Sequence, residues 1–236
     1  MRKQEIQQGF KDGVPIALGY FSVSFSFGIM AAGGGLSVFQ AALTSLTNMT
    51  SAGQFAGLQI MVAGGALLEL AVTQLIINLR YALMSLSLSQ KLSKEVTMWQ
   101  RLVIAFANTD EIFAVAMSHE KDLSFPYIVS LQVLPILGWT GGTACGAAAG
   151  NLLPSSVNSA LSVALYGMFL AVVIPAAKKA RPVLFAVILA ALLSCLLYYV
   201  PLFSGITAGM SIILCTIAAS AAGAVLFPIP EEGGEK

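Results

Sequence analysis

The sequence predicts an all-α fold, a polytopic transmembrane helical bundle with about six to eight membrane segments. Two observations predict this class: 57% of the 236 residues are hydrophobic and only 10% are charged, and the mean hydropathy is +0.85. Both observations lie outside the range of soluble globular chains. A helix needs about 20 apolar residues to cross a bilayer, so we expect one transmembrane domain over residues 1–236, without an appended soluble domain.

Clusters of charged residues separate the apolar runs. The segments expected to enter the membrane are, in chain order, Val14–Gly33, Leu36–Ala52, Gly57–Leu88, Leu102–Met117, Phe125–Leu152, Ser155–Ala177, Pro182–Val200 and Phe203–Phe227. The first run follows basic residues, as the core of a signal peptide does. It is longer than such a core and more membrane sequence follows, so we interpret it as a retained helix.

Lysine and arginine collect at the N-terminus and in the loops 91–101 and 178–181. Cytoplasmic loops carry the excess of these residues, so all three sites are expected in the cytoplasm, with an even number of crossings between successive sites. Eight full crossings would break this rule twice. We therefore predict that Leu36–Ala52, rich in Ser, Thr and Asn, and Leu102–Met117, with two adjacent acids, are re-entrant or broken helices, which points to a transport path.

A polar cluster within membrane sequence runs from Asn48 to Phe55. Its helix-competing side chains, followed by Gly53, predict a local break in the helix. Freed backbone groups there, together with Gln54, could hold the carboxylate or the ammonium group of a ligand. Polar packing in the core explains the same cluster equally well.

Four charged residues lie within membrane sequence and outside the loop clusters: Glu69, Arg80, Asp110 and Glu111. A charge at the centre of a bilayer costs a few kcal/mol, so such a residue is normally paired or faces a cavity. A functional role is therefore the first hypothesis for all four.

The segment Gly57–Leu88, taken as one helix, is polar on two sides. The spacing of Glu69, Thr73 and Arg80 places them within about 40° of one face, whereas Asn78 lies on the opposite side. A helix that is polar on two sides is expected inside the bundle.

Arg80 lies roughly 16 Å of helix from Lys91, too far to reach the interface easily, so it needs an internal partner. Asp110 or Glu111 is the natural partner, because both acids lie midway through an apolar segment. The other acid would then be a candidate for proton coupling. The alternative is that both acids flank an interfacial helix and face water.

Gly138, Gly142, Gly146 and Gly150 recur every four residues. This spacing lines one ridge of a helix without side chains and lets a neighbouring backbone approach closely. We predict a helix-packing surface here, in preference to a contact with substrate.

Four stretches in the first half of the chain, Gly9–Pro15, Ser51–Phe55, Ile77–Tyr81 and Thr109–Glu111, carry the sequences GFKDGVP, SAGQF, INLRY and TDE. In order and spacing they resemble the AzlC family of branched-chain amino acid permeases. The second half is similar in hydropathy and length alone. The resemblance implies export of branched-chain or similar hydrophobic amino acids across the bacterial inner membrane, with a separately encoded small hydrophobic AzlD-type subunit as partner.

The working hypothesis is a secondary transporter subunit that works by alternating access. No phosphate-binding Gly-rich loop with its Lys-Ser/Thr end occurs, so an ion gradient would supply the energy. The residues expected to bind the substrate are Asn48, Gly53, Gln54 and Asn78. Those expected to form ion pairs or couple ions are Glu69, Arg80, Asp110 and Glu111.

Other classes are disfavoured by what the sequence contains. We expect no enzyme, cofactor or metal site, because His119 is the single histidine and lies among loop charges, and no Gly-x-Ser-x-Gly elbow occurs. A net charge of +1 without a clustered basic face gives no reason to expect a nucleic-acid partner, so the surroundings are membrane lipid. The alternatives that stay open are a non-transporting scaffold or accessory subunit, and a channel.

Overall fold

The computed structural model describes residues 2–119, 122–150, 170, 173–203 and 205–228. Every regular element in these ranges is a helix, which confirms the all-α class. Five of the helices are long and apolar enough to cross a membrane: α1 (Arg2–Gly33), α4 (Leu67–Lys91), α7 (Phe125–Gly150), α9 (Arg181–Tyr199) and α10 (Ala208–Leu226). The expected segment Ser155–Ala177 lies largely outside the described residues.

The chain forms two compact units. Unit 1 comprises Met1–Leu58 and Asn78–Leu165, and unit 2 comprises Gln59–Ile77 and Tyr166–Lys236. The chain passes from unit 1 to unit 2 within α3 (Ala52–Val62), and it returns to unit 1 within α4.

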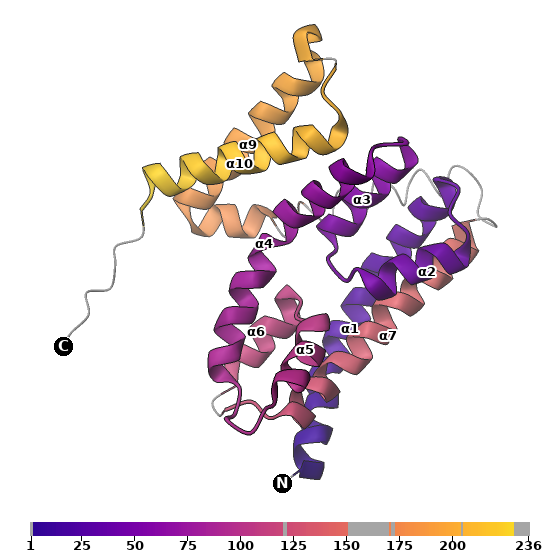
Figure 1. The fold of residues 1–236 in the computed structure, drawn as a ribbon, viewed down its shortest axis with the longest axis vertical. Helices are drawn as coiled ribbons and strands as arrows, with labels where there is room; N and C mark the ends of the chain where they lie inside the picture. The colour runs from indigo at the N-terminus through magenta and orange to yellow at the C-terminus, as the bar shows by residue number, and fades with distance from the viewer. Residues whose placement is uncertain (1, 120–121, 151–169, 171–172, 204, 229–236) are drawn as a thin grey trace. The chain divides into compact units, whose positions relative to one another are not determined.

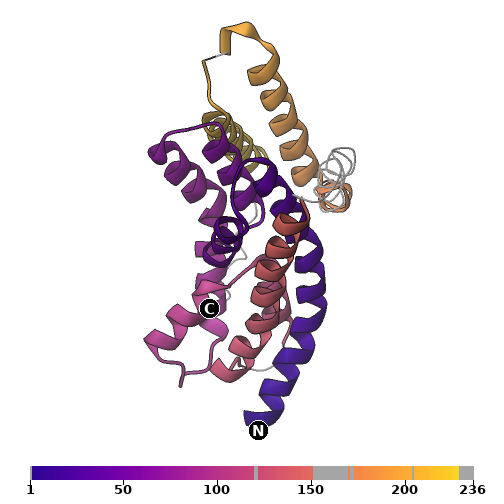
Figure 2. The ribbon, with the colours of Figure 1, turned by 90° about the vertical axis from the view of Figure 1, so that its right-hand side faces the viewer.

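The core of unit 1 is the pair α1 and α7, which lie side by side (Figures 1 and 2). Gly9 lies against the backbone of Tyr127, and Gly28 lies against the backbone of Thr143. Both contacts advance in the same direction along the two helices, so α1 and α7 run parallel.

The glycine ridge of α7 forms this interface, as predicted. Gly138, Gly142 and Gly146 each lie against the backbone of α1 with no room for a side chain, and Gly150 continues the ridge with a looser contact. Close approach of two backbones gives extensive van der Waals contact, which drives helix association in lipid. The pair is therefore a rigid support along which the other helices of unit 1 are placed.

The first predicted break is present between α2 (Val38–Thr47) and α3. In the turn between them Ser51 has a φ of 45°, a left-handed value that ends a helix. Ser45 of α2 and Gln54 of α3 are hydrogen-bonded across this turn, so the chain folds back instead of continuing. Because α2 follows α1 directly, this hairpin enters from the Gly33 end of α1, opposite the N-terminus (Figure 1).

The second predicted break separates α5 (Met98–Phe106) from α6 (Asp110–Ser118). The outer ends of both arms are tied to the end of α4. Arg101 of α5 donates to the carbonyl of Ser89 at 3.0 Å, and Lys91 donates to the carbonyl of Met117 at 2.6 Å.

The end of α4 in turn lies beside the start of α7, because the backbones of Lys91 and Leu123 are hydrogen-bonded. Both arms of the α5–α6 hairpin therefore start and finish at the N-terminal end of α1 and α7 (Figure 1). Both predicted breaks are therefore present, as helical hairpins that enter unit 1 from opposite ends.

The prediction of a single helix over Gly57–Leu88 is wrong. Helix α3 ends at Val62, and α4 begins at Leu67 after a turn in which Gly64 has a φ of +68°. Glycine adopts this conformation without the steric cost that a Cβ would add, so two adjacent glycines allow a tight turn inside an apolar run. Glu69 consequently lies in the first turn of α4.

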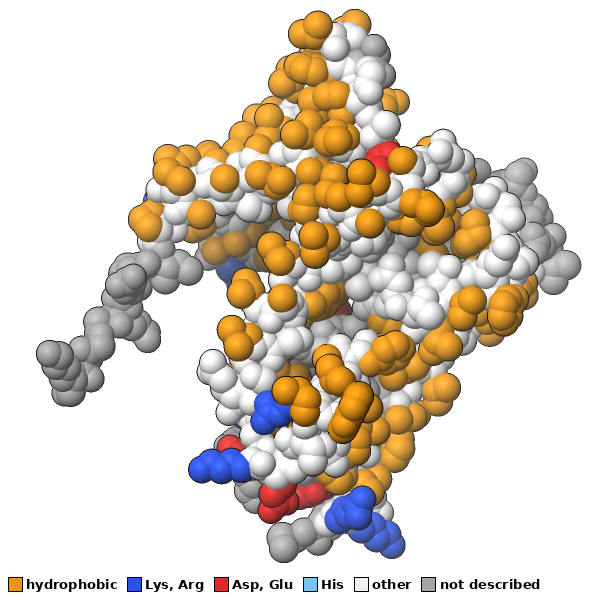
Figure 3. Space-filling model, in the orientation of Figure 1, with side chains coloured by type: hydrophobic (Ala, Val, Ile, Leu, Met, Phe, Trp, Pro, Cys, Tyr) orange, Lys and Arg blue, Asp and Glu red, His pale blue; other side chains and the backbone are white. Residues whose placement is uncertain are grey.

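In unit 2, α9 and α10 pack together and are joined through the 3₁₀ turn η1 (Pro201–Phe203). Phe185 and Phe227 are in ring contact, with centroids 5.6 Å apart. No residue of α9 is buried, and hydrophobic side chains cover both helices in the space-filling view (Figure 3). Helices that are apolar on all sides are suited to a lipid environment.

Candidate functional site

A salt bridge joins the middle of α4 to the start of α6. Arg80 Nη2 lies 2.9 Å from Asp110 Oδ2, and the two side chains are 47% and 43% exposed. The guanidinium group also lies over the ring of Tyr81, 4.9 Å from its centroid. The predicted partner of Arg80 is therefore the carboxylate of Asp110, in a pair that is about half exposed in the described structure.

The neighbouring acid, Glu111, is held by α1. The Tyr20 hydroxyl is hydrogen-bonded to the Glu111 carboxylate and, at 2.6 Å, to the hydroxyl of Thr109. A phenol carries one proton and a carboxylate only accepts, so Tyr20 donates to Glu111 and accepts from Thr109. The two acids that open α6 thus have different partners, one cationic and one neutral.

A buried chain of contacts runs from Tyr20 to the other hairpin. The rings of Tyr20 and Trp139 meet edge to face, with centroids 5.2 Å apart. Trp139 Nε1 donates to Gln54 Oε1 at 2.9 Å, and Gln54 Nε2 donates to Ser45 Oγ. Ser45 is in turn hydrogen-bonded to Thr143 of α7 at 2.6 Å. The tips of both hairpins are therefore fastened to the α1–α7 pair.

Apolar residues in the turns of both hairpins belong to the same buried cluster. Met49, in the turn between α2 and α3, and Ala107, in the turn between α5 and α6, belong to one buried cluster that includes Tyr20 and Trp139. Two breaks in helical backbone thus border the same buried cluster of unit 1. Irregular backbone at membrane depth persists only where it is buried in protein or lines a cavity.

The expected substrate-binding residues of unit 1 lie in different surroundings. Gln54 is 1% exposed and uses both ends of its amide within the network. Asn48 caps the end of α2 and accepts from the hydroxyl of Thr50 at 2.7 Å, Gly53 is buried in the first turn of α3, and Asn78 is partly buried on α4. Gln54 therefore positions a hairpin tip, and Asn48 and Gly53 lie at that tip.

Glu69 lies in unit 2, at the start of α10. Its Oε1 accepts from the Thr207 hydroxyl and, at 3.0 Å, from the backbone N–H of Gly209. A carboxylate at a helix N-terminus is stabilised by the unsatisfied N–H groups and by the helix dipole. These contacts give Glu69 a role in holding α4 to α10.

Sequence reasoning did not identify Tyr20 or Trp139, because one aromatic residue in an apolar run is typical of core packing. A signal for the two hairpins was present. Both carry an N-cap hydroxyl, a glutamine that completes a capping box, and an asparagine at the tip: Ser37, Gln40 and Asn48 in the first, and Thr97, Gln100 and Asn108 in the second. Each residue of the second set lies 60 positions after its counterpart. The two hairpins are corresponding elements inserted from opposite ends.

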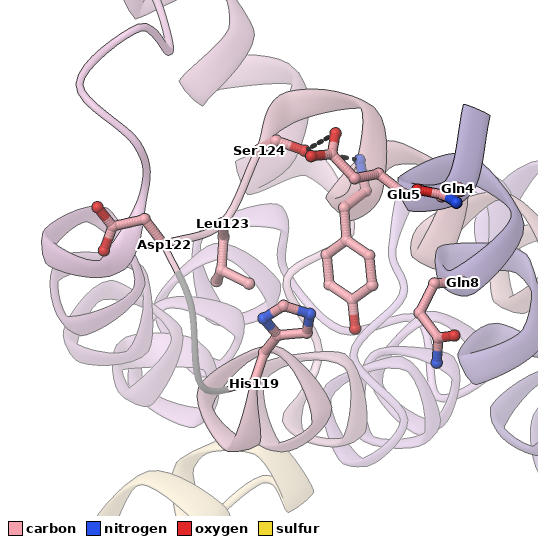
Figure 4. Close-up of a pocket in the computed structure, with 8 residues that line it drawn as sticks. Gln4, Glu5, Gln8, His119, Asp122, Leu123 and Ser124 are labelled. Carbon is pink, nitrogen blue, oxygen red and sulfur yellow. Dashed lines mark hydrogen bonds between the residues drawn. The ribbon is translucent and has the colours of Figure 1, made fainter. Parts of the chain in front are cut away.

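A polar pocket of about 400 Å³ opens at the N-terminal end of unit 1 (Figure 4). Its walls are formed by Gln4, Glu5, Gln8, His119, Asp122, Leu123, Ser124 and Tyr127. Ser124 donates to Glu5 at 2.9 Å, which fixes the start of α1 to the start of α7. The pocket is thus a polar opening at the end of the unit, and the residues of the hairpin tips are not part of its lining.

Replacing Trp139 by phenylalanine is expected to lower the free energy of unfolding by about 1–3 kcal/mol, because a buried acceptor, Gln54 Oε1, loses its donor. The measurement is thermal unfolding of the detergent-solubilised protein. Trp99→Phe is the matched control, since Trp99 is 79% exposed on α5. Equal stability of the two variants would contradict the assignment of Trp139 to the network.

Comparison with known proteins gives one matching family model and several similar membrane proteins. A family model described as AzlC protein matches residues 15–153, which include both hairpins and all of α7. An uncharacterised membrane protein of Archaeoglobus fulgidus is 32% identical over 174 residues, 73% of this chain and 76% of that protein. The inner membrane protein YgaZ of Escherichia coli is 26% identical over 212 residues, 86% of each chain.

A membrane protein of Helicobacter pylori is 28% identical over 158 residues, 62% of this chain and 67% of that protein. No solved structure matches the chain. Together with the five helices of spanning length among the described residues, these matches show a multi-pass membrane protein.

Proposed function

The chain belongs to the AzlC family of membrane proteins, and from this premise we propose that it is the permease subunit of a secondary transporter for branched-chain or similar hydrophobic amino acids. The observation that carries the proposal is the pair of broken helical hairpins whose tips are both hydrogen-bonded to the contacting pair Tyr20 and Trp139. Broken helices at the bilayer midplane are the usual binding sites of secondary transporters.

The amino acid binds between the two tips in this proposal. The first turn of α3, which contains Gly53, has no acidic residue, so the positive end of its helix dipole can attract a carboxylate. Asn48 and Asn78 supply further polar contacts, and Gln54 holds the tip in place. The apolar side chains of the surrounding cluster select a branched side chain.

The Arg80–Asp110 pair is the switch of the proposed cycle. It ties α4 to the α5–α6 hairpin, so opening and closing it changes the position of one tip relative to the α1–α7 pair. Alternating access then needs no ATP and no chemical step, and an ion gradient supplies the energy. We assign outward flux across the bacterial inner membrane and a small hydrophobic AzlD-type subunit as partner, both from family membership.

Counterflow of radiolabelled leucine in proteoliposomes tests this function, with and without the small subunit. We expect saturable exchange that requires the partner, and no exchange of aspartate, because the proposed walls are apolar. Absence of exchange for every hydrophobic amino acid would favour the scaffold hypothesis. Flux that neither saturates nor shows counterflow would favour a channel.

A further inference from the structure

We infer that the tip of the α5–α6 hairpin is a binding site for a monovalent cation, either the ammonium group of the amino-acid substrate or an alkali-metal ion. The inference deepens the proposed function, on which it rests for the identity of the substrate. Three observations support it: the buried side chain of Asn108, the position of Asp110 two residues later, and the negative charge of the α5–α6 tip.

Asn108 has a buried oxygen that no described group satisfies. The side chain is 5% exposed, and its Nδ2 donates to Ser85 Oγ at 3.0 Å. Within the described part of the chain, no donor lies within hydrogen-bond distance of its Oδ1. A buried acceptor left unsatisfied is destabilising, so this oxygen favours a donor or a cation from outside the chain.

The corresponding residue of the other hairpin provides an internal comparison. Asn48 Oδ1 accepts from the hydroxyl of Thr50, two residues later, at 2.7 Å. The residue two positions after Asn108 is Asp110, whose carboxylate cannot donate. The same position thus provides a hydrogen-bond donor at one tip and an additional acceptor at the other.

The charge of the α5–α6 tip is negative. Arg80 offsets Asp110, whereas Glu111 is held by the neutral hydroxyl group of Tyr20, so the formal charges of Arg80, Asp110 and Glu111 sum to one negative charge. The end of α5 adds the negative end of a helix dipole at Phe106. Oxygen ligands and carbonyl ends of half-helices are the groups that bind cations in transporters.

The α2–α3 tip lacks this character, because α3 has no acidic residue in its first turn. The two corresponding hairpins therefore differ in charge at their tips, and only the α5–α6 tip carries acidic residues at the start of its second helix. This difference would orient a zwitterionic amino acid with its ammonium group toward Asn108. An alkali-metal ion that binds together with the substrate carboxylate would likewise lie on the Asn108 side.

The test measures cation binding separately from transport. The protein with its small subunit is purified in detergent, and the shift of its unfolding temperature is recorded with each compound. Leucine is compared with 4-methylvalerate, which is leucine without the amino group. NaCl and KCl are each compared with choline chloride at equal ionic strength. Stabilisation by leucine but not by 4-methylvalerate identifies the ammonium group. Stabilisation by NaCl or KCl over choline chloride identifies an alkali-metal ion.

Asn108→Leu is expected to weaken binding of the cation that stabilises the wild type by about fivefold or more, because the variant removes the buried acceptor oxygen. Asn108→Asp, which keeps oxygen at this position, should bind the cation more tightly. Ser118→Ala, at the outer end of α6, is the control and should behave as wild type. If Asn108→Leu does not fold, the sign of the change in Asn108→Asp decides.

The outcomes separate the two proposals. Cation-dependent stabilisation that weakens in Asn108→Leu, in a protein without leucine counterflow, supports the cation site and removes the transport assignment. Leucine counterflow and cation response that are unchanged in Asn108→Leu and Asn108→Asp overturn the cation site and leave the transport assignment standing. A wild-type protein that responds to none of the cations also overturns the site.

Discussion

Arg80→Ala is expected to reduce leucine counterflow by about 50-fold or more. The substitution leaves Asp110 without its cationic partner at the tip of a re-entrant hairpin. An unpaired carboxylate at membrane depth costs about 2.5–3.5 kcal/mol on insertion scales, and each 1.36 kcal/mol corresponds to a factor of ten in rate. Because the two side chains are about half exposed, the effect should be at the lower end of this range.

Counterflow in proteoliposomes measures this effect, with Lys94→Ala as the control for loss of a cation from an exposed loop position. Asp110→Asn should cause a loss of similar size, because it leaves Arg80 unpaired. The double variant Arg80→Leu/Asp110→Leu should be more stable to heat than either single alanine variant, since no unpaired charge remains. Transport by Arg80→Ala at the wild-type rate would remove the switch from the mechanism.

Gly146→Leu is expected to have the largest effect on folding. A Cβ at this position would overlap the backbone of Phe25, so α1 and α7 would have to separate. Overpacking typically costs about 1–3 kcal/mol, and the cost should be at or above the upper end here because backbone must move. We expect loss of the monodisperse peak in size-exclusion chromatography of the detergent-solubilised protein.

The same helix offers a matched control. Gly141 has no atom within 4 Å of the position where a Cβ would lie, so Gly141→Leu should retain the wild-type elution profile and unfolding temperature. If Gly146→Leu and Gly141→Leu elute alike, the glycine ridge does not determine the packing of α1 against α7.

Part of this architecture could be predicted because the positions of basic loops restrict the number of membrane crossings between them. The basic clusters at the N-terminus and in loops 91–101 and 178–181 required an even number of crossings between successive clusters, and this requirement predicted one broken helix in each interval. The burial cost of a charge likewise predicted a partner for Arg80. The choice of Asp110 over Glu111 depended on tertiary packing, since both acids open the same helix turn.

Other features followed from packing that no local pattern expresses. The turn at Gly64 lies within an unbroken apolar run, and periodicity alone does not distinguish a glycine that packs from one that turns the chain. Tyr20 and Trp139 became part of the site because the parallel arrangement of α1 and α7 places their rings together. The repeated pattern that ends at Asn48 and Asn108 was visible in the sequence, but its meaning required the opposite directions of the two hairpins.

The hydrogen bond between Trp139 and Gln54 has a spectroscopic consequence. The chain contains two tryptophans, and Trp99 is exposed on α5, so Trp99→Phe leaves the buried indole as the single source of tryptophan emission. The emission maximum of an indole depends on the polarity around its ring and on its N–H partner. Trp139 contacts Tyr20 on one side and donates to the α2–α3 hairpin on the other. Its fluorescence would therefore follow movement of the hairpin tips without any attached label.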